Sequence, residues 1–208
     1  MTEKKRSIKP DEQAVRERLL QSALDIFNEK GYATTSVREI VEAAGVTKPS
    51  LYYYFGSKEG IYTELMTKPF GILEKMLVET AHEKLSSRQR VLRLYEGIFL
   101  LFMKNLKAAR LMYSIYYGPP QGAPFIDFEG YHLKIREVTE FIVKDGTRSG
   151  EIRKVNADTL TCVLIGALNF VLEEQLCHRA PMVDKKGLAS MIAFIFDGVA
   201  PSKSKRKR

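Results

Sequence analysis

Apolar residues recur at three- and four-residue intervals along almost the whole chain, and no segment alternates with the two-residue period of a β-strand. Glycines and short polar residues interrupt this pattern where helices commonly end and begin. The pattern predicts an all-α fold. The predicted helices cover about 11–30, 36–44, 47–55, 57–77, 87–104, 107–117, 125–145, 157–178 and 185–197, with loops at 118–124 and 146–150.

Signals at the helix ends account for the short second and third helices. Ser36 and Glu39 form the capping-box pattern, in which each side chain bonds the backbone of the other. Gly45 is placed to stop the helix that this box opens, and Thr47 is placed to cap the next one. Pro69 lies inside the fourth predicted helix and should kink it or split it.

Segment 35–54 combines a short helix, a glycine-containing turn and a second short helix, which is helix-turn-helix geometry. The second helix of such a pair can lie in the DNA major groove. Between Val46 and Ser57 the only charged residue is Lys48, while hydroxyl groups are frequent. Free N–H groups at a helix N-terminus favour phosphate, and tyrosine hydroxyls can reach phosphate oxygens or bases. The residues predicted to contact DNA on this basis are Ser36, Thr47, Lys48, Ser50, Tyr52, Tyr53 and Lys58.

The pattern alone leaves another interpretation open. Short helix pairs occur in many proteins that never bind DNA, and consecutive tyrosines can pack partly inside a domain. The net charge of +8 on 208 residues does not decide the matter, because five of the basic residues lie in the acid-free segment 201–208. A basic chain end is more often a solvated tail than a binding site.

The motifs of the N-terminal region resemble those of the TetR/AcrR family of bacterial transcriptional regulators. The resemblance is dense and order-preserving over about residues 12–66, and it is carried by Leu19–Phe27, Gly31–Tyr32, Thr35–Val41, Ala44–Val46 and Leu51–Glu59. It implies a homodimeric regulator, usually a repressor, that a small ligand releases from a palindromic operator. It also implies DNA contacts by Ser36, Thr47, Lys48, Tyr52, Tyr54 and Lys58.

Two positions of the DNA-contacting surface depart from the family's pattern. Tyr54 stands where the family often has histidine, which keeps a phosphate hydrogen bond but changes its reach. Pro49 stands where many members have a small residue, and it removes a backbone donor near the bases. We include Pro49 in the predicted surface, but the base preference of relatives cannot be transferred to this chain.

The chain is predicted to divide into four parts. They are an N-terminal arm at 1–10, a DNA-binding domain at 11–66, a ligand-binding and dimerisation domain at 67–198, and a basic tail at 199–208. The helices at 157–178 and 185–197 are apolar on almost every side, so they should be buried on every side. Pairing with the same helices of a second subunit would achieve this; the alternative is that they only close the core of their own subunit.

Aromatic residues and methionines cluster in the middle of the chain and predict a site for a bulky, largely apolar or aromatic effector. Asn169 and Glu173, one turn apart on an apolar helix, could be its polar anchors. Ordinary core packing is the alternative for any of these residues. The predicted effector-binding residues are Phe99, Met103, Tyr113, Tyr116, Tyr117, Phe128, Tyr131, Asn169 and Glu173.

Other classes of protein fit the sequence poorly. The first residues do not resemble a signal peptide, and the longest nearly unbroken apolar run, Cys162–Leu172, is too short to span a bilayer. Two cysteines suit a reducing compartment. No phosphate-binding glycine loop or hydrolase motif occurs, and Glu174 with His178 reads as a surface pair rather than a metal site. We therefore expect a cytoplasmic, non-enzymatic chain without cofactor or metal.

An architectural DNA-binding protein that uses its basic tail is the second hypothesis, and it predicts weak sequence preference with strong salt dependence.

Overall fold

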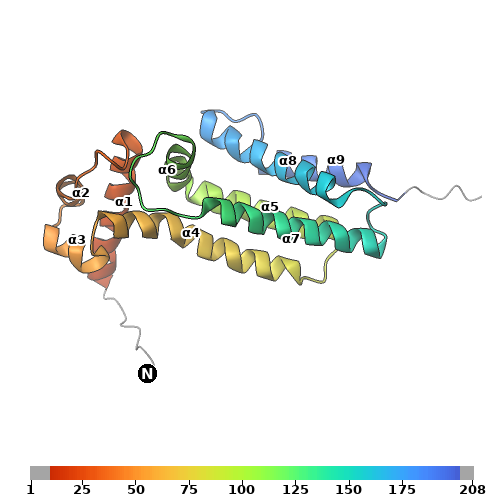
Figure 1. Cartoon of the computed structure of the whole chain (residues 1–208), viewed down its shortest axis with the longest axis horizontal. Coiled ribbons are helices and arrows are strands. Elements are labelled where there is room, and N and C mark those ends of the chain that lie inside the picture. Colours follow the sequence, from red (N-terminus) through yellow and green to blue (C-terminus); the bar gives the residue numbers. More distant parts are fainter. Residues whose placement is uncertain (1–9, 202–208) are drawn as a thin grey trace, which may run out of the picture. The chain divides into compact units, whose positions relative to one another are not determined.

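A computed structural model describes residues 10–201, and every regular element within that range is a helix (Figure 1). This confirms the all-α prediction. The helices are α1 Pro10–Lys30, α2 Val37–Ala44, α3 Lys48–Phe55, α4 Lys58–Ala81, α5 Ser87–Lys104, α6 Leu106–Tyr117, α7 Phe128–Ser149, α8 Ala157–Cys177 and α9 Lys185–Gly198. The predicted arm before residue 10 and the basic residues of the tail after residue 201 lie outside the described residues.

The local signals set the ends of α2 as expected. The Ser36 hydroxyl accepts a hydrogen bond from the Glu39 backbone N–H, and the Ser36 N–H donates to Glu39 Oε2 at 2.8 Å. Gly45 ends the helix with a φ of +63°, a conformation that favours glycine. Thr47 occupies the N-cap of α3 but its side chain accepts no backbone N–H there. Its hydroxyl instead lies 3.1 Å from the Ser50 hydroxyl.

Helix α4 is not split at Pro69, as one version of the prediction required. Proline removes one intrahelical hydrogen bond. Met66 before it and Leu73 and Leu77 after it are all buried, so packing on both sides compensates for the lost bond.

The described chain forms two compact units. The first comprises the residues up to Lys68 together with Lys107–Ile126, and the second comprises Pro69–Leu106 and the residues from Asp127 onward. In the first unit, the rings of Phe27, Tyr32 and Tyr62 pack together, with centroids 5.3 Å apart for Phe27–Tyr32 and 5.0 Å apart for Tyr32–Tyr62. Burial raises the pKa of Tyr62 to about 12, so its phenol is neutral at physiological pH.

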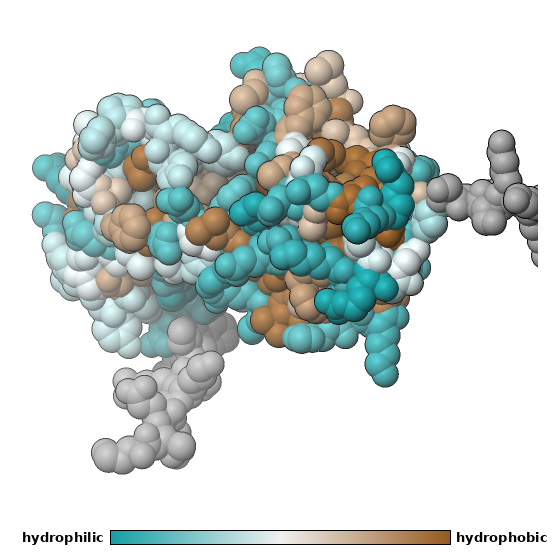
Figure 2. All heavy atoms as spheres, turned by 45° about the vertical axis from the view of Figure 1, so that its right-hand side comes forward, coloured by the Kyte–Doolittle hydropathy of each residue, from teal (hydrophilic) through white to brown (hydrophobic). Residues whose placement is uncertain are grey.

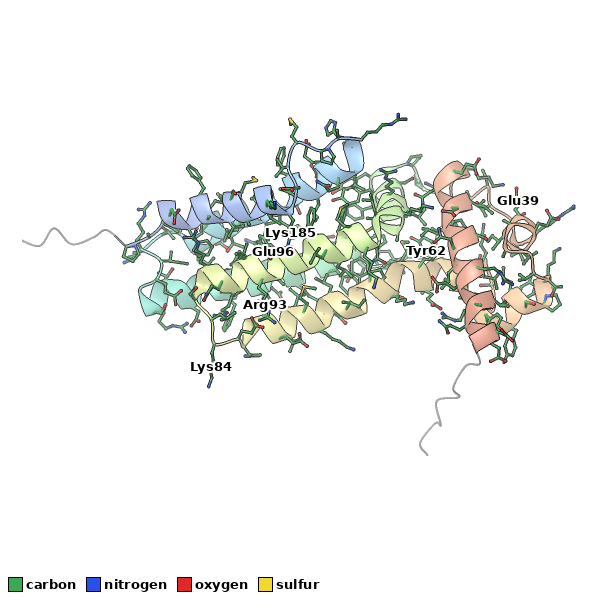
Figure 3. All side chains as sticks on the ribbon, turned by 180° about the vertical axis from the view of Figure 1, so that it is seen from behind. Glu39, Tyr62, Lys84, Arg93, Glu96 and Lys185 are labelled. Carbon is green, nitrogen blue, oxygen red and sulfur yellow. The ribbon has the colours of Figure 1, made fainter. Side chains whose placement is uncertain are left out.

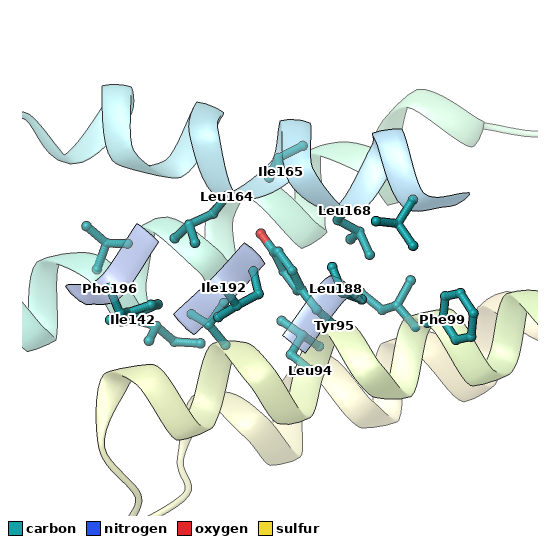
Figure 4. Close-up of a cluster of buried hydrophobic side chains, with 14 of the residues drawn as sticks. Leu94, Tyr95, Phe99, Ile142, Leu164, Ile165, Leu168, Leu188, Ile192 and Phe196 are labelled. Carbon is teal, nitrogen blue, oxygen red and sulfur yellow. The ribbon is translucent and has the colours of Figure 1, made fainter. Parts of the chain in front are cut away.

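The second unit has a core drawn from α4, α5, α7, α8 and α9 (Figure 4). Tyr95 is fully buried in this core, and its hydroxyl lies 3.1 Å from Thr139 Oγ1. The Thr139 hydroxyl in turn donates to the Ile135 carbonyl at 2.9 Å. Burial raises the pKa of Tyr95, which keeps this hydroxyl pair neutral inside the core.

Helices α8 and α9 bury one side and leave apolar side chains exposed on the other. Val163 and Phe170 of α8 are 49% and 43% exposed, and Phe194 of α9 is 81% exposed. Figure 2 shows apolar side chains on the surface near the C-terminal end of the chain. Helix α8 is long and apolar enough to cross a membrane, but 56% of its most apolar window is buried within the protein, as in a core helix.

Candidate DNA-binding surface

Helix α3 is held by one apolar side and presents polar groups on the other. It packs with α2, which packs with α1 (Figure 1). Leu51 is fully buried, whereas Tyr52 and Tyr53 on the same helix are 51% and 69% exposed. Lys48, at the first position of α3, is also exposed. The arrangement therefore turns the start of the helix and two phenol rings toward solvent.

Tyr54 differs from the two tyrosines before it because it is partly buried. Its ring meets the Tyr53 ring edge-on, with centroids 4.9 Å apart. Loss of solvent around the hydroxyl, followed by the negative charge of Glu12, raises the pKa of Tyr54. The phenol therefore stays a neutral hydrogen-bond donor, which is the form that can bind a phosphate oxygen.

Lys48 has no ion-pair partner among the described residues, in contrast to Arg16, Lys30 and Arg38. Arg38 lies 2.7 Å from Glu42, Arg16 pairs with Glu64, and Lys30 pairs with Glu39. A cation without an acidic partner is attracted to DNA without first breaking an internal contact. Lys48 is thus the basic group on α3 that is best placed for phosphate.

Two predicted DNA contacts also hold the turn between α1 and α2. The Lys58 ammonium donates to the carbonyls of Tyr32 at 3.0 Å and Thr35 at 2.9 Å, and it lies 4.2 Å from the Tyr32 ring centroid. The Ser36 hydroxyl donates to Glu39 Oε2 at 2.7 Å. These internal bonds leave Lys58 one N–H for a phosphate. The capping role of Ser36 was predicted from the sequence, whereas the structural role of Lys58 was not.

The carboxylate of Glu39 (Figure 3) is the most strongly perturbed acid of this region. The hydrogen bond from Lys30, then those from the Ser36 backbone and hydroxyl, lower the pKa of Glu39 to about 2. The capping box at the start of α2 is therefore fully ionised at physiological pH.

The nine predicted effector-binding residues are distributed over both compact units. Tyr113, Tyr116 and Tyr117 lie on α6 in the first unit, and the other six lie in the second. In the second unit, the Phe70 ring stacks on Tyr131 with centroids 3.9 Å apart and lies 5.8 Å from Phe128. Phe99 belongs to the buried core. Met103, Asn169 and Glu173 are at least partly exposed. Their part in effector binding stays a prediction.

Sequence reasoning missed several residues whose contacts span long distances along the chain. Gln121 accepts a hydrogen bond from the Tyr32 backbone at 2.9 Å, and the buried Arg90 binds Asp145 at 2.8 Å. The pair Lys185–Glu96, with an N···O distance of 3.9 Å, is of the same kind (Figure 3). No periodicity or motif marks such partners, because each is defined only by the folded chain.

Comparisons with known proteins agree with this geometry. Residues 19–65 match the profile of "Bacterial regulatory proteins, tetR family". The chain is similar to the HTH-type transcriptional regulator YdgC of Bacillus subtilis, with 39% identity over 88 residues, which is 40% of this chain and 45% of YdgC. It is also similar to IcaR of Staphylococcus aureus, a negative transcriptional regulator of the biofilm operon icaADBC, with 28% identity over 85 residues, 41% of this chain and 44% of IcaR. The matched segment thus spans less than half the length of either relative.

The fold is similar to a solved structure over most of the chain. The TetR family transcriptional regulator PfmR of Thermus thermophilus superposes with a TM-score of 0.68 at 22% sequence identity, covering 88% of this chain and 100% of PfmR. At this identity the likeness concerns the fold, including the helical region that follows the helix-turn-helix.

Proposed function

By its N-terminal DNA-binding region the chain belongs to the tetR family of bacterial regulatory proteins, and from this premise we propose that it is a ligand-responsive repressor that binds a near-palindromic operator as a homodimer. The observation that carries the proposal is the exposed side of α3. Lys48, which has no acidic partner among residues 10–201, lies there with the exposed rings of Tyr52 and Tyr53. Repression is supported by the similarity to IcaR, a negative regulator.

The DNA-contacting groups fall into two kinds. Lys48, Thr47 and Ser50 lie at the N-terminus of α3, where backbone N–H groups and the helix dipole favour phosphate. Tyr52 and Tyr53 extend from the exposed side and can reach sugar, phosphate or the thymine methyl group. The proposed surface also includes Pro49, Tyr54, Ser36 and Lys58. The donor groups of Ser36 and Lys58 are partly used by bonds within the protein.

The homodimer of the proposal forms through α8 and α9. Their exposed apolar side chains would be covered by the same helices of a second copy, giving four helices about a twofold axis. Two recognition helices would then meet successive major grooves about 34 Å apart, or a multiple of that spacing, which requires an operator with matching half-sites.

The effector of the proposal is a small, largely apolar or aromatic molecule. Its binding would alter α4, in which Pro69 interrupts the hydrogen-bond ladder, and would thereby lower the affinity for DNA. By thermodynamic linkage the operator must weaken effector binding by the same factor. A cytoplasmic location and a non-enzymatic role follow from this function.

The proposal is tested by selecting bound fragments from the source genome with wild-type protein and with the Lys48→Ala/Tyr52→Ala double variant. A near-palindromic site recovered by the wild type and lost in the double variant supports it. Lys75→Ala, an exposed lysine of the second unit, is the charge-matched control and should recover the same site. If wild type and double variant recover the same unrelated fragments, the protein is the architectural DNA binder of the second hypothesis.

A further inference from the structure

The backbone of Tyr32, just after the end of α1, is held by a residue from a distant part of the chain. Its N–H donates to Gln121 Oε1 at 2.9 Å, across 89 positions of sequence. Gln121 lies between α6 and α7, in the segment Lys107–Ile126 that packs with the DNA-binding helices as one compact unit.

Tyr32 also binds two residues at the start of α4, Lys58 and Glu59. Its carbonyl accepts from the Lys58 ammonium at 3.0 Å and from the Thr35 N–H at 3.3 Å. Its hydroxyl donates to Glu59 Oε1 at 3.2 Å. Thr35 directly precedes Ser36, the cap of α2. Gln121 therefore binds the N–H of Tyr32, while the carbonyl and hydroxyl of Tyr32 bind residues that lie just before α2 and at the start of α4.

The surroundings of the Gln121 side chain are built to place its oxygen. Its amide nitrogen donates to the Ser114 hydroxyl at 3.3 Å, which fixes which end of the amide faces Tyr32. A Cβ atom at Gly31 would come within 2.9 Å of Gln121 Oε1, and Gly31 has a φ of +87°. The backbone conformation thus favours glycine there, and a side chain at this position would displace the Gln121 oxygen.

Other contacts tie the same segment to α1, but they fix it less closely. The Asn28 side chain donates to the Lys107 carbonyl at 3.0 Å, and Lys107 forms an ion pair with Asp25 on the surface. An exposed ion pair contributes little to positioning. The bond between Gln121 and Tyr32 is partly buried, so water competes with it less.

We propose that Gln121 is a positioning residue for DNA recognition: its side-chain oxygen fixes the Tyr32 peptide and thereby the Lys58 and Ser36 ends of the helix-turn-helix. The DNA consequence rests on the proposed function, whereas the positioning itself is a property of the free protein. The segment after α6 thus acts as part of the DNA-reading unit.

The test compares three full-length variants with the wild type. Gln121→Met removes the acceptor at similar volume, and Gln121→Glu retains an oxygen for the Tyr32 N–H. Gln21→Met is the matched control, because within the described part of the chain the exposed Gln21 amide bonds only Asp25 on its own helix. Amide hydrogen exchange at Tyr32 and Thr35 is measured without DNA, and affinity is measured for the operator fragment recovered from the genome.

In Gln121→Met we expect exchange at both amides to rise by at least about tenfold and operator affinity to fall by about 3- to 10-fold. Gln121→Glu should restore the protection of both amides, and Gln21→Met should match the wild type in both measurements. Unchanged exchange in Gln121→Met overturns the proposal, and so does faster exchange with full operator affinity.

If the wild type recovers no specific fragment, the proposed function fails. The exchange data then decide alone: faster exchange confined to Tyr32 refutes positioning, and faster exchange that includes Thr35 supports it.

Discussion

At the scale of single residues, Glu39 ties stability to pH. When ionised it binds Lys30 and both polar groups of Ser36, and its pKa in the folded protein is about 2 against an ordinary value of 4.5. A lowered pKa stabilises the fold fully above the ordinary value, and this contribution is lost as the pH falls through the folded value. Glu39→Gln should keep the Ser36 bond but lose the charge, so the variant should melt below the wild type at neutral pH.

The gap in melting temperature between wild type and Glu39→Gln should be constant above pH of about 5.5 and should close between about 4.5 and about 2. Thermal melts across this range measure it. Glu42→Gln is the control, because Glu42 contacts Arg38 on an open surface and should change the melting temperature little. An equal gap for Glu39→Gln at low and neutral pH would show that the ionised carboxylate contributes nothing.

Replacing Lys48 should weaken DNA binding without destabilising the fold. Because it is exposed and has no acidic partner among the described residues, Lys48→Ala should leave the free energy of unfolding within about 0.5 kcal/mol of the wild type. It should weaken operator binding and lower the slope of log affinity against log salt concentration by about 1, the loss of one phosphate contact. Binding titrations at several salt concentrations measure both. A slope equal to that of the wild type and of Lys75→Ala would remove Lys48 from the interface.

At the scale of helices, sequence reasoning succeeded where the determinant is local. The capping box of α2 joins Ser36 to a residue three positions away, and Gly45 ends the helix by its own φ. It was incomplete where the determinant is a distant partner. Lys58 binds a carbonyl 26 positions away and Gln121 an N–H 89 positions away, so neither contact is marked by a motif.

Arg90 on α5 illustrates such a distant determinant, because it holds the C-terminal end of α4. Its side chain is 4% exposed, donates to the carbonyls of Thr80 and Ala81, and binds Asp145 of α7 at 2.8 Å. Arg90→Met leaves these carbonyls and the carboxylate without their partner. We expect the free energy of unfolding to fall by about 2–3 kcal/mol, at the lower end for a broken buried pair because Asp145 is partly exposed.

Urea denaturation of Arg90→Met and of Arg93→Met checks this expectation. Arg93 lies on the same helix and pairs with Glu83, but its side chain is 67% exposed, so its replacement should cost less than about 1 kcal/mol. Similar losses in the two variants would mean that Arg90 is no more than a surface contact.

At the scale of the whole molecule, residues that are neighbours in sequence belong to different compact units. The aromatic residues between 99 and 131 form one cluster along the chain, and the sequence predicted one effector site from them. The chain enters the first compact unit at Lys107 and leaves it after Ile126, so the tyrosines of α6 belong to the unit that contains the DNA-binding helices. Phe128 and Tyr131 belong to the second unit, where they pack on Phe70. The clustering of aromatic residues along the sequence cannot reveal that residues 107–126 belong to the first unit. Their place there depends on contacts with distant residues, such as that of Gln121 with Tyr32.

Dimerisation through α8 and α9 would change the environment of an exposed phenylalanine on α9. If α8 and α9 pair with their copies, Phe194, which is 81% exposed in the single chain, becomes buried in the dimer. Phe194→Glu would place an unpaired charge in an apolar interface, which is costly. The variant should sediment as a folded monomer at concentrations where the wild type is a dimer, and it should lose the affinity gained from binding two half-sites together. Phe125→Glu is the matched control, because Phe125 is 88% exposed in the Lys107–Ile126 segment of the other unit and should leave the dimer intact. A dimeric Phe194→Glu protein with wild-type affinity would mean that the exposed side of α9 lies outside the subunit interface.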